Sequence, residues 1–306
     1  MTLDLTGRGL SGLPTSIWDL PNLVSLCLDD NQLTSLPATM ERLTGIQDLS
    51  LWRNLLTSVP DTLWHLTSLE TLNLAENRLT SLPAQVGELT ALRMLDLGHN
   101  ELASLPEELG RLTGLSGYLY LSHNQLTAVP ESLGNLVRLA YLNISDNQLT
   151  SLPDTIGHLT SLRELRLYNN RLAALPESLG NLSSLRELHL WNNELTSLPP
   201  SLGNLRNLRE LGLRDNRLAS LPESIGNLTR LARLDLRNNK LAEIPPSLGN
   251  LPSLTHLDLR ANRLVSLPDS IGELPNLEKL DLRWNKWSAL PAWIDRLEER
   301  GCAVLL

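Results

Sequence analysis

The sequence repeats with a period of 23 residues along its whole length. Asparagine marks the period in twelve repeats, with one inserted residue before the fifth: Asn31, Asn54, Asn77, Asn100, Asn124, Asn147, Asn170, Asn193, Asn216, Asn239, Asn262 and Asn285. A period of this length is typical of a solenoid, in which each repeat contacts only its neighbours. Such a chain builds no closed pocket from distant segments, so we expect its function on one long surface.

Each repeat has the same internal frame, as in LRELHLWNNELTSLPPSLGNL at residues 185–205. Leucines alternate with other residues in the LxL segment, which predicts a strand with one buried face. The later LPxxLxxL segment predicts a single helical or 3-10 turn on the opposite side. A proline at one fixed offset ends the strand side, because proline has no N–H for a ladder. We interpret the repeated asparagine as structural, since its amide can bond backbone groups where each coil turns.

The frame LxxLxLxxNxLxxLPxxLxxLxx resembles the leucine-rich repeat family, and the resemblance covers essentially all 306 residues. It is similar to the 23-residue intracellular type, which includes Ras-suppressor-like, Ras-group and stand-alone bacterial proteins. The resemblance implies an α/β horseshoe solenoid with a parallel β-sheet on the concave face and short helical or 3-10 turns on the convex face. About thirteen repeats would span residues 1–291 and a C-terminal cap residues 292–306. The first repeat is degenerate, because Arg8 stands at the asparagine position.

Both ends of a solenoid expose a core that must be covered. At the C-terminus we expect a short amphipathic helix over Ala292 to Arg300 and an extended segment over Cys302 to Leu306, with Trp287 and Trp293 covering the last coil. At the N-terminus the chain enters its first strand at once. Asp4 there discourages edge pairing. An alternative is that this edge docks onto another chain.

One repeat carries an extra residue, in the segment LTGLSGYLYLSHN at residues 112–124. A single insertion at the start of a strand predicts a bulge or a widened turn. We therefore expect an irregular backbone between Leu115 and Leu119. Because Tyr118 and Tyr120 follow directly, we also expect the insertion to tilt their rings.

The aromatic residues of the strand positions form the strongest candidate site. All four tyrosines of the chain fall there, Trp191 continues the series, and phenylalanine is absent, so aromatics are not used as core filler. Tyrosine, tryptophan and arginine are enriched at binding hot spots. The alternative is that the rings stack on one another and only stabilise the sheet. The candidate partner-binding residues are Tyr118, Tyr120, Tyr141, Arg166, Tyr168, His189, Trp191 and Arg214.

A second pattern occupies the last third of the chain, where aspartates and arginines alternate along the strands. They are Asp235, Arg237, Asp258, Arg260, Asp281 and Arg283, with Arg214 extending the basic series. One interpretation is a strip that recognises acidic groups, because arginine can grip a carboxylate with two parallel bonds. The favoured interpretation is an internal ladder of ion pairs, which needs no partner.

The histidines do not predict a metal or catalytic site. His99 and His123 occupy equivalent positions, and His189 and His256 lie on the strand face, without the carboxylate or cysteine neighbours that a metal site requires. We therefore read them as ordinary surface residues. No Ser–His–Asp set or glycine-rich phosphate loop can be assembled from the sequence. We expect no enzymatic activity, no cofactor and no bound metal.

Charge and cysteine content restrict the partner and the compartment. The net charge is −8, with 16 acidic and 7 basic residues up to position 150 and 18 acidic and 19 basic residues after it. The acidic first half would repel phosphate backbones, which weighs against nucleic acid. No apolar run is long enough to span a membrane and no secretory signal is visible. Cys27 and Cys302 lie too far apart to pair. We expect a cytoplasmic protein.

These observations together predict a non-enzymatic scaffold for protein–protein interaction that binds a protein partner on its concave face. We expect a monomer in which a rigid sheet positions the contact residues before binding. The resemblance implies scaffolding or signalling partners. The alternative is a substrate-recognition subunit or bacterial effector that recruits a separate enzyme.

Overall fold

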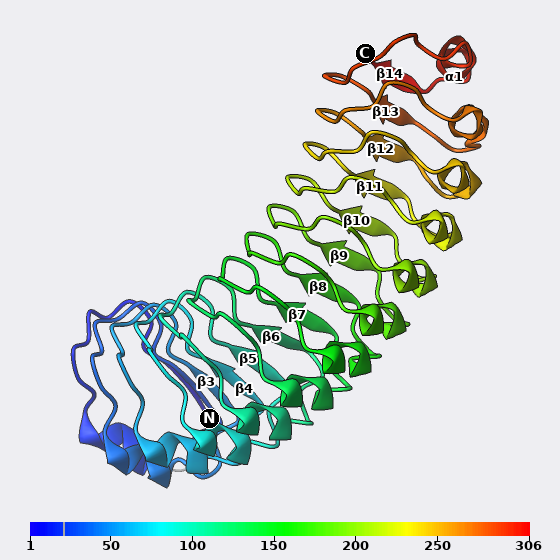
Figure 1. Cartoon of the computed structure of the whole chain (residues 1–306). Coiled ribbons are helices and arrows are strands. Elements are labelled where there is room, and N and C mark those ends of the chain that lie inside the picture. Colours follow the sequence, from blue (N-terminus) through cyan, green and yellow to red (C-terminus); the bar gives the residue numbers. More distant parts are fainter. Residues whose placement is uncertain (21) are drawn as a thin grey trace. The chain divides into compact units, whose positions relative to one another are not determined.

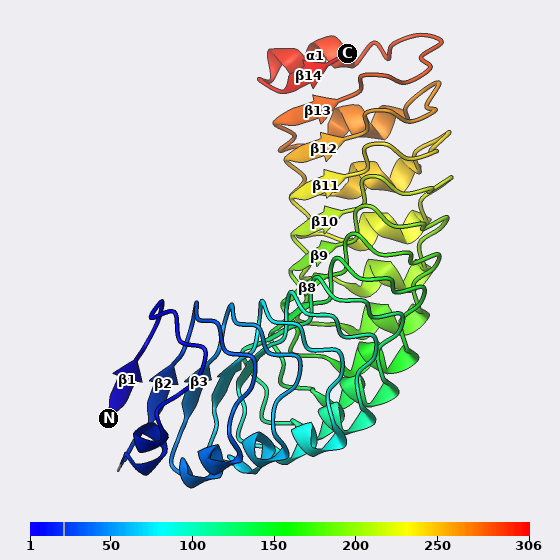
Figure 2. The same cartoon turned by 90° about the vertical axis from the view of Figure 1, so that its left-hand side faces the viewer.

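The computed structural model describes residues 1–20 and 22–306. Contacts divide the chain into two compact units, unit 1 from Met1 to Gln148 and unit 2 from Leu149 to Leu306. In each unit the chain coils repeatedly, and every coil places one short strand on one side and one helical turn on the other (Figures 1 and 2). The repeats therefore form a solenoid in each unit.

The strands of unit 1 pair in parallel and in chain order, each with the next along the sequence. They are β1 Thr2–Asp4, β2 Ser25–Cys27, β3 Asp48–Ser50, β4 Thr71–Asn73, β5 Met94–Asp96, β6 Tyr118–Tyr120 and β7 Tyr141–Asn143. The strands of unit 2 pair in the same way. They are β8 Glu164–Arg166, β9 Glu187–His189, β10 Glu210–Gly212, β11 Arg233–Asp235, β12 His256–Asp258, β13 Lys279–Asp281 and β14 Ala303–Leu305.

A 3-10 helix of five residues lies opposite the strands in each complete repeat. In unit 1 these are η1 Thr15–Asp19, η2 Ala38–Arg42, η3 Asp61–His65, η4 Ala84–Glu88, η5 Glu107–Arg111 and η6 Glu131–Asn135. In unit 2 they are η7 Asp154–His158, η8 Glu177–Asn181, η9 Pro200–Asn204, η10 Glu223–Asn227, η11 Pro246–Asn250 and η12 Asp269–Glu273. Each begins directly after a proline whose carbonyl accepts the first 3-10 bond, as Pro176 accepts from Leu179 at 3.1 Å.

Leucines fill the space between the strands and the 3-10 helices. The middle leucine of each strand from β2 to β13 is at most 1% exposed, and so is the residue two positions later, which is leucine except for Ile144 after β7. Burying one such side chain contributes about 1.5–3 kcal/mol. From η4 to η12 the fourth residue of the 3-10 helix is glycine, which permits close stacking: a Cβ on Gly180 would lie 2.3 Å from the carbonyl oxygen of Ser201 in the next coil. The fold class and the core predicted from the repeat are therefore confirmed.

The repeated asparagine is structural, as predicted. In Asn77, Oδ1 accepts the backbone N–H of Leu56 at 3.0 Å, and Nδ2 donates to the carbonyls of Leu51 at 2.9 Å and Leu74 at 3.1 Å. Equivalent bonds recur along the repeats and tie each coil to the one before it. The residue before each repeated asparagine has a positive φ of 52–60°, as Glu76 does. The buried amide thus supplies partners to a turn whose backbone groups cannot reach water.

The inserted residue changes the start of β6. Strand β6 pairs with β5 at two positions, Leu119 with Leu95 and Tyr120 with Asp96, whereas the neighbouring strand pairs of unit 1 match at three. At neighbouring repeats the first strand residue and the residue before it donate their N–H groups to one carbonyl, as Arg93 and Met94 do to Glu70, whereas at β6 the donors are Ser116 and Gly117, one residue earlier. The predicted irregularity before Leu119 is therefore confirmed. The predicted tilting of the tyrosine rings by this insertion stays a prediction.

The C-terminal segment closes the core of unit 2. Helix α1, Ile294–Glu299, and strand β14, which pairs with β13, lie within the ranges predicted for them. Trp293 is only 3% exposed and packs on η12, where a Cβ on Gly272 would lie 2.6 Å from its Cγ. Trp287 is half-buried, and its Nε1 donates to the carbonyl of Leu282 at 3.1 Å. Across the described residues, helices are too short and too polar to cross a lipid bilayer.

Candidate functional site

The strand face of each unit consists of the first and third residues of its strands, which flank the buried leucine, and of the residue two positions after each strand, such as Tyr168 or Trp191. The parallel register places equivalent residues of neighbouring strands side by side. Thus His189 of β9 pairs with Gly212 of β10, and Gly212 pairs with Asp235 of β11. Side chains of one repeat position therefore form a lane across the strands, spaced roughly 4.8 Å apart.

Three of the candidate aromatics form a cluster on the strand face of unit 1. The ring centroids of Tyr118 and Tyr120 lie 4.7 Å apart, and those of Tyr120 and Tyr141 lie 5.0 Å apart, with tilts of 49° and 56°. All three side chains are half-buried. Burial raises the pKa of the Tyr118 hydroxyl, and the nearby carboxylate of Asp96 adds to this increase. The tyrosines therefore support one another while each keeps part of its ring in solvent.

The other two aromatics form a flat stack on the strand face of unit 2. The rings of Tyr168 and Trp191 lie parallel, with centroids 4.1 Å apart and an interplanar angle of 7°. The ring of His189 meets Trp191 edge-on at 5.2 Å, and the guanidinium carbon of Arg214 lies 5.1 Å from the Trp191 centroid. Stacking and partial exposure thus occur together, so the two interpretations of the aromatics do not exclude each other.

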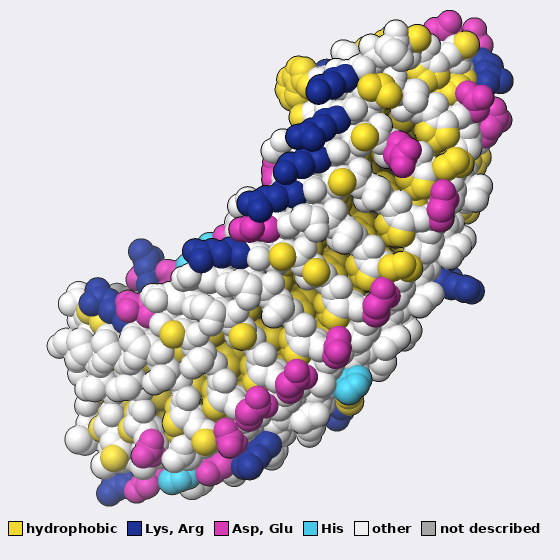
Figure 3. Space-filling view, viewed as in Figure 1, with side chains coloured by type: hydrophobic (Ala, Val, Ile, Leu, Met, Phe, Trp, Pro, Cys, Tyr) yellow, Lys and Arg dark blue, Asp and Glu magenta, His cyan; other side chains and the backbone are white. Residues whose placement is uncertain are grey.

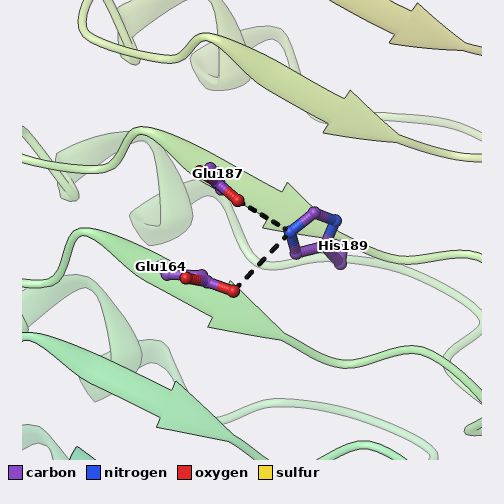
Figure 4. Close-up of side chains that lie close together, drawn as sticks. All are labelled: Glu164, Glu187 and His189. Carbon is purple, nitrogen blue, oxygen red and sulfur yellow. Dashed lines mark hydrogen bonds and ion pairs between the residues drawn. The ribbon is translucent and has the colours of Figure 1, made fainter.

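His189 differs from the surface histidine that the sequence predicted. It is 7% exposed, and its Nε2 lies 3.3 Å from a carboxylate oxygen of Glu187 and 3.8 Å from one of Glu164 (Figure 4). The expectation that no histidine has carboxylate neighbours is therefore wrong for His189. Because a carboxylate only accepts hydrogen bonds, these contacts require a proton on Nε2, and in the tautomer that has its only proton there Nδ1 is an acceptor. Nδ1 is buried without a hydrogen-bond partner.

Glu164, Glu187 and His189 bring three atoms that can ligate a metal within 4.8 Å of one another. Two features favour a hydrogen-bonded cluster instead. The Nε of Arg166 donates at 2.6 Å to the same Glu164 oxygen that faces His189. Nδ1 of His189 also lacks the acceptor that orients a metal-binding histidine from its far side. The two carboxylates therefore fix the orientation of the imidazole ring.

A hollow of about 360 Å³ opens where Gly212 leaves its lane without a side chain. We call this the Gly212 hollow; it is lined by strand-face residues of β9 to β13 together with Trp191 and Arg214. A Cβ on Gly212 would lie 3.2 Å from Cε3 of Trp191 and 3.7 Å from Nδ1 of His189. The unpartnered Nδ1 and one edge of the tryptophan therefore face the space that a side chain would fill.

The carboxylates around the Gly212 hollow are not equally compensated. Glu210 pairs with Arg233, Asp258 with Arg260, and Asp281 with both Arg260 and Arg283. Asp235 makes no ion pair with any described residue, and its Oδ1 accepts only the backbone N–H of Arg237, at 3.1 Å. Burial raises the pKa of Asp235, and the neighbouring Asp258 adds to this increase.

The Arg/Asp pattern of the last third is in part an internal ladder. Arg260 contacts Asp258 at 2.5 Å and Asp281 at 3.2 Å, and Arg283 contacts Asp281 at 2.7 Å. Burial of Asp281 favours its neutral form, but the hydrogen bonds from Arg283 and the charge of Arg260 outweigh burial and lower the pKa. The ion-pair interpretation holds for these two repeats and fails at Asp235.

Sequence reasoning located the seven side chains of the two aromatic clusters but missed Gly212 and Asp235 as site residues; the seven are Tyr118, Tyr120, Tyr141, Tyr168, His189, Trp191 and Arg214. The signal for Gly212 was available, because it is the single glycine among the thirteen residues that stand between the two strand leucines. Arg166, predicted as a partner contact, is engaged by Glu164.

A further group of exposed cations follows the repeated asparagine in four successive repeats, and we call this row the basic file: Arg217, Lys240, Arg263 and Lys286. Figure 3 shows a row of basic side chains along unit 2.

Family models agree with the repeat assignment. A model described as leucine-rich repeat region matches residues 117–211 and 197–298, and one described as leucine rich repeat matches residues 21–79, 44–102 and 67–126. No curated protein sequence matches the chain significantly.

Solved structures with the same fold come from bacteria and plants. A leucine-rich repeat protein of Leptospira interrogans is 38% identical, with a TM-score of 0.89 over 97% of this chain and 76% of that one. The ectodomain of the Arabidopsis thaliana membrane receptor kinase GASSHO1/SCHENGEN3, in complex with CASPARIAN STRIP INTEGRITY FACTOR 2, is 35% identical with a TM-score of 0.81, over 96% of this chain and 36% of that one. The PEPR1–AtPEP1 structure is 30% identical with a TM-score of 0.82, over 96% of this chain and 43% of that one.

Proposed function

Because the chain belongs to the leucine-rich repeat family, we propose that it is a non-enzymatic binding module that takes a protein or peptide partner on the strand face of unit 2. The observation that carries this proposal is the Gly212 hollow, which combines a missing side chain, a buried Nδ1 of His189 without a hydrogen-bond partner and a carboxylate of Asp235 that makes no ion pair with any described residue. Two similar structures support a ligand on this fold: one is named as a plant membrane receptor kinase ectodomain in complex with CASPARIAN STRIP INTEGRITY FACTOR 2, and the other as PEPR1-AtPEP1.

The hollow favours one kind of contact. The hollow extends along β9 to β13, and its missing side chain lies at Gly212, between His189 and Asp235, which is where one side chain of the partner can insert. A basic group there would compensate Asp235 and could donate to Nδ1 of His189. A buried polar atom left without a partner is unfavourable, so such an insertion removes a penalty that the free protein carries. The partner therefore contributes an arginine or lysine at this point.

The stacked pair of Tyr168 and Trp191 serves as the rigid wall beside the hollow. Both rings are held in the free protein, by each other and by His189 and Arg214. Fixing these side chains before association lowers the entropy lost on binding. We propose that the cluster of Tyr118, Tyr120 and Tyr141 provides a second contact area on unit 1, by the same argument.

A comparison of three baits in lysate of the source organism tests the proposal. One bait is wild type, one carries Tyr168→Ala and Trp191→Ala, and one carries Asn204→Ala and Arg206→Ala, which change exposed residues on the 3-10 side of unit 2. We expect one set of proteins to be captured by the wild type and by the 3-10 variant and lost from the aromatic variant. Thermal melts of all baits confirm folding. Equal capture by all three would contradict binding through this face.

A further inference from the structure

A second hollow of unit 2 lies at the edge where the chain enters its strands. It measures about 190 Å³ and is lined by Arg163, Ser184, Arg186, Asn207, Arg209 and Arg230. We call it the arginine hollow. Arg163, Arg186 and Arg209 directly precede β8, β9 and β10. The backbone N–H of Arg186 donates to the carbonyl of Arg163 at 2.8 Å, and that of Arg209 to the carbonyl of Arg186 at 2.7 Å. The three arginines are therefore immediate neighbours in one lane.

No carboxylate lines the arginine hollow. The glutamate that follows each of these arginines belongs to the strand face and is engaged there. Glu164 contacts Arg166 and His189, Glu187 contacts His189, and Glu210 pairs with Arg233. Within the described part of the chain, Arg163, Arg186 and Arg209 make no ion pair through their guanidinium groups. Like charges one strand spacing apart repel each other, so this lane lacks the counter-charge that its neighbours have.

The remaining lining residues hold the hollow in shape and add donors. Nη1 of Arg230 donates to Oδ1 of Asn207 at 2.6 Å, and Nδ2 of Asn207 donates to the carbonyl of Ser183 at 2.8 Å. Arg230 is thereby fixed at the rim with its other guanidinium N–H groups available, and Ser184 contributes a hydroxyl. Four guanidinium groups around a small concave volume match the donors that a tetrahedral oxyanion requires.

We propose that the arginine hollow is an anion site that binds a phosphate group, either free or as a phosphate monoester. Arginine binds phosphate through two parallel N–H···O bonds, and a dianion also relieves the repulsion among the four cations. The basic file of Arg217, Lys240, Arg263 and Lys286 makes no comparable site, because it follows the opposite ends of the strands and Arg217 there is already paired with Glu194. The site is independent of the strand-face binding proposed above.

The test uses the purified full chain and inorganic phosphate as the probe. Binding is measured by isothermal titration calorimetry and by the rise in the melting temperature, with sodium chloride replacing phosphate at equal ionic strength. We expect saturable binding that weakens about tenfold or more in Arg186→Gln and in Arg209→Gln, as loss of a charge-assisted bidentate contact implies. Arg263→Gln has the same change in net charge at the basic file and should leave the affinity unchanged.

A second arm distinguishes the source of the phosphate. Capped phosphoserine and capped serine amides are titrated against the same proteins, and we expect only the phosphorylated compound to bind and to compete with inorganic phosphate. Binding that is no stronger than the ionic-strength control would overturn the proposal. So would an equal loss of affinity in Arg263→Gln, since that result describes a diffuse attraction to all basic residues rather than a site.

Discussion

Replacing Asn193 by alanine removes one link of the asparagine ladder in the repeat that carries Trp191. In the native chain Oδ1 of Asn193 accepts the N–H of Leu172 at 3.0 Å, and Nδ2 donates at 3.0 Å to the carbonyls of both Leu167 and Leu190. A longer contact, 3.4 Å, reaches the carbonyl of Trp191 itself. The side chain is buried, so water cannot replace these partners without opening the coil.

The expected loss follows from which groups keep a partner. The carbonyl of Leu167 retains the amide of Asn170, and that of Leu190 retains the amide of Asn216. Only the N–H of Leu172 is left without a bond, which costs about 1–3 kcal/mol. The two weakened carbonyls add about 0.5–1 kcal/mol between them. We therefore expect Asn193→Ala to lower local stability by about 1.5–4 kcal/mol. Asn193→Asp should lower stability at least as much, because it places a carboxylate oxygen against the two carbonyl oxygens that accept N–H groups from Asn193 in the native chain.

Amide hydrogen exchange at Leu172 is the appropriate assay, because repeat proteins unfold in parts and a single melting curve averages over them. A loss of 2 kcal/mol or more accelerates exchange about 30-fold or more. Asn285→Ala is the control, since Asn285 makes the same bonds at the partly exposed end of the ladder and should lose less. If Asn193→Asp behaved like wild type, or if Asn193→Ala cost no more than Asn285→Ala, the ladder argument would be refuted.

Three further predictions concern single side chains. Asp96→Asn and Asp235→Asn should each raise the melting temperature at pH 7 but not at pH 3. Burial raises the pKa of both carboxyls in the folded protein above its value in the unfolded chain. Each carboxyl is therefore neutral and harmless at low pH, and the folded protein loses stability as pH rises and the buried group must ionise. Gly212→Asn should abolish partner capture in the bait assay while the protein still folds in thermal melts, because the new side chain fills the hollow and its Cβ lies 3.2 Å from Cε3 of Trp191. Trp293→Ala should cost about 3–5 kcal/mol in denaturant titrations, because it uncovers the end of the core.

The fold could be predicted because each repeat carries the same residue pattern and forms the same local structure. The leucine spacing, the buried asparagine and the helix at the C-terminal end follow from patterns that lie within one period, and the structure agrees with each. The division at Gln148 could not be predicted, because the repeat frame passes through that point unchanged. Contacts between equivalent residues, rather than sequence within a repeat, determine it.

The site was harder to predict because it depends on side chains that are a full period apart. His189 meets Glu164 only because parallel register places positions 25 residues apart on adjoining strands. The aromatic lanes were found from the sequence, since composition alone singled out four tyrosines. The unsatisfied Nδ1 of His189 and the unpaired Asp235 required side-chain geometry, because the neighbouring Asp258 and Asp281 have the same sequence context and are paired.

A repeat protein provides internal comparisons for judging whether an unfavourable feature has a purpose. Asp281 and Asp235 occupy the same lane, yet Asp281 makes ion pairs with two arginines and Asp235 makes none with any described residue. Asn143 fills the same lane in unit 1 and bonds the N–H of Ser145 at 3.0 Å, whereas Gly212 leaves the place empty. Other repeats of the chain thus show a paired aspartate and a filled lane position, and the repeats around the hollow have neither. Because both departures meet at one hollow beside Trp191, the stability forgone there points to a ligand that completes the lane.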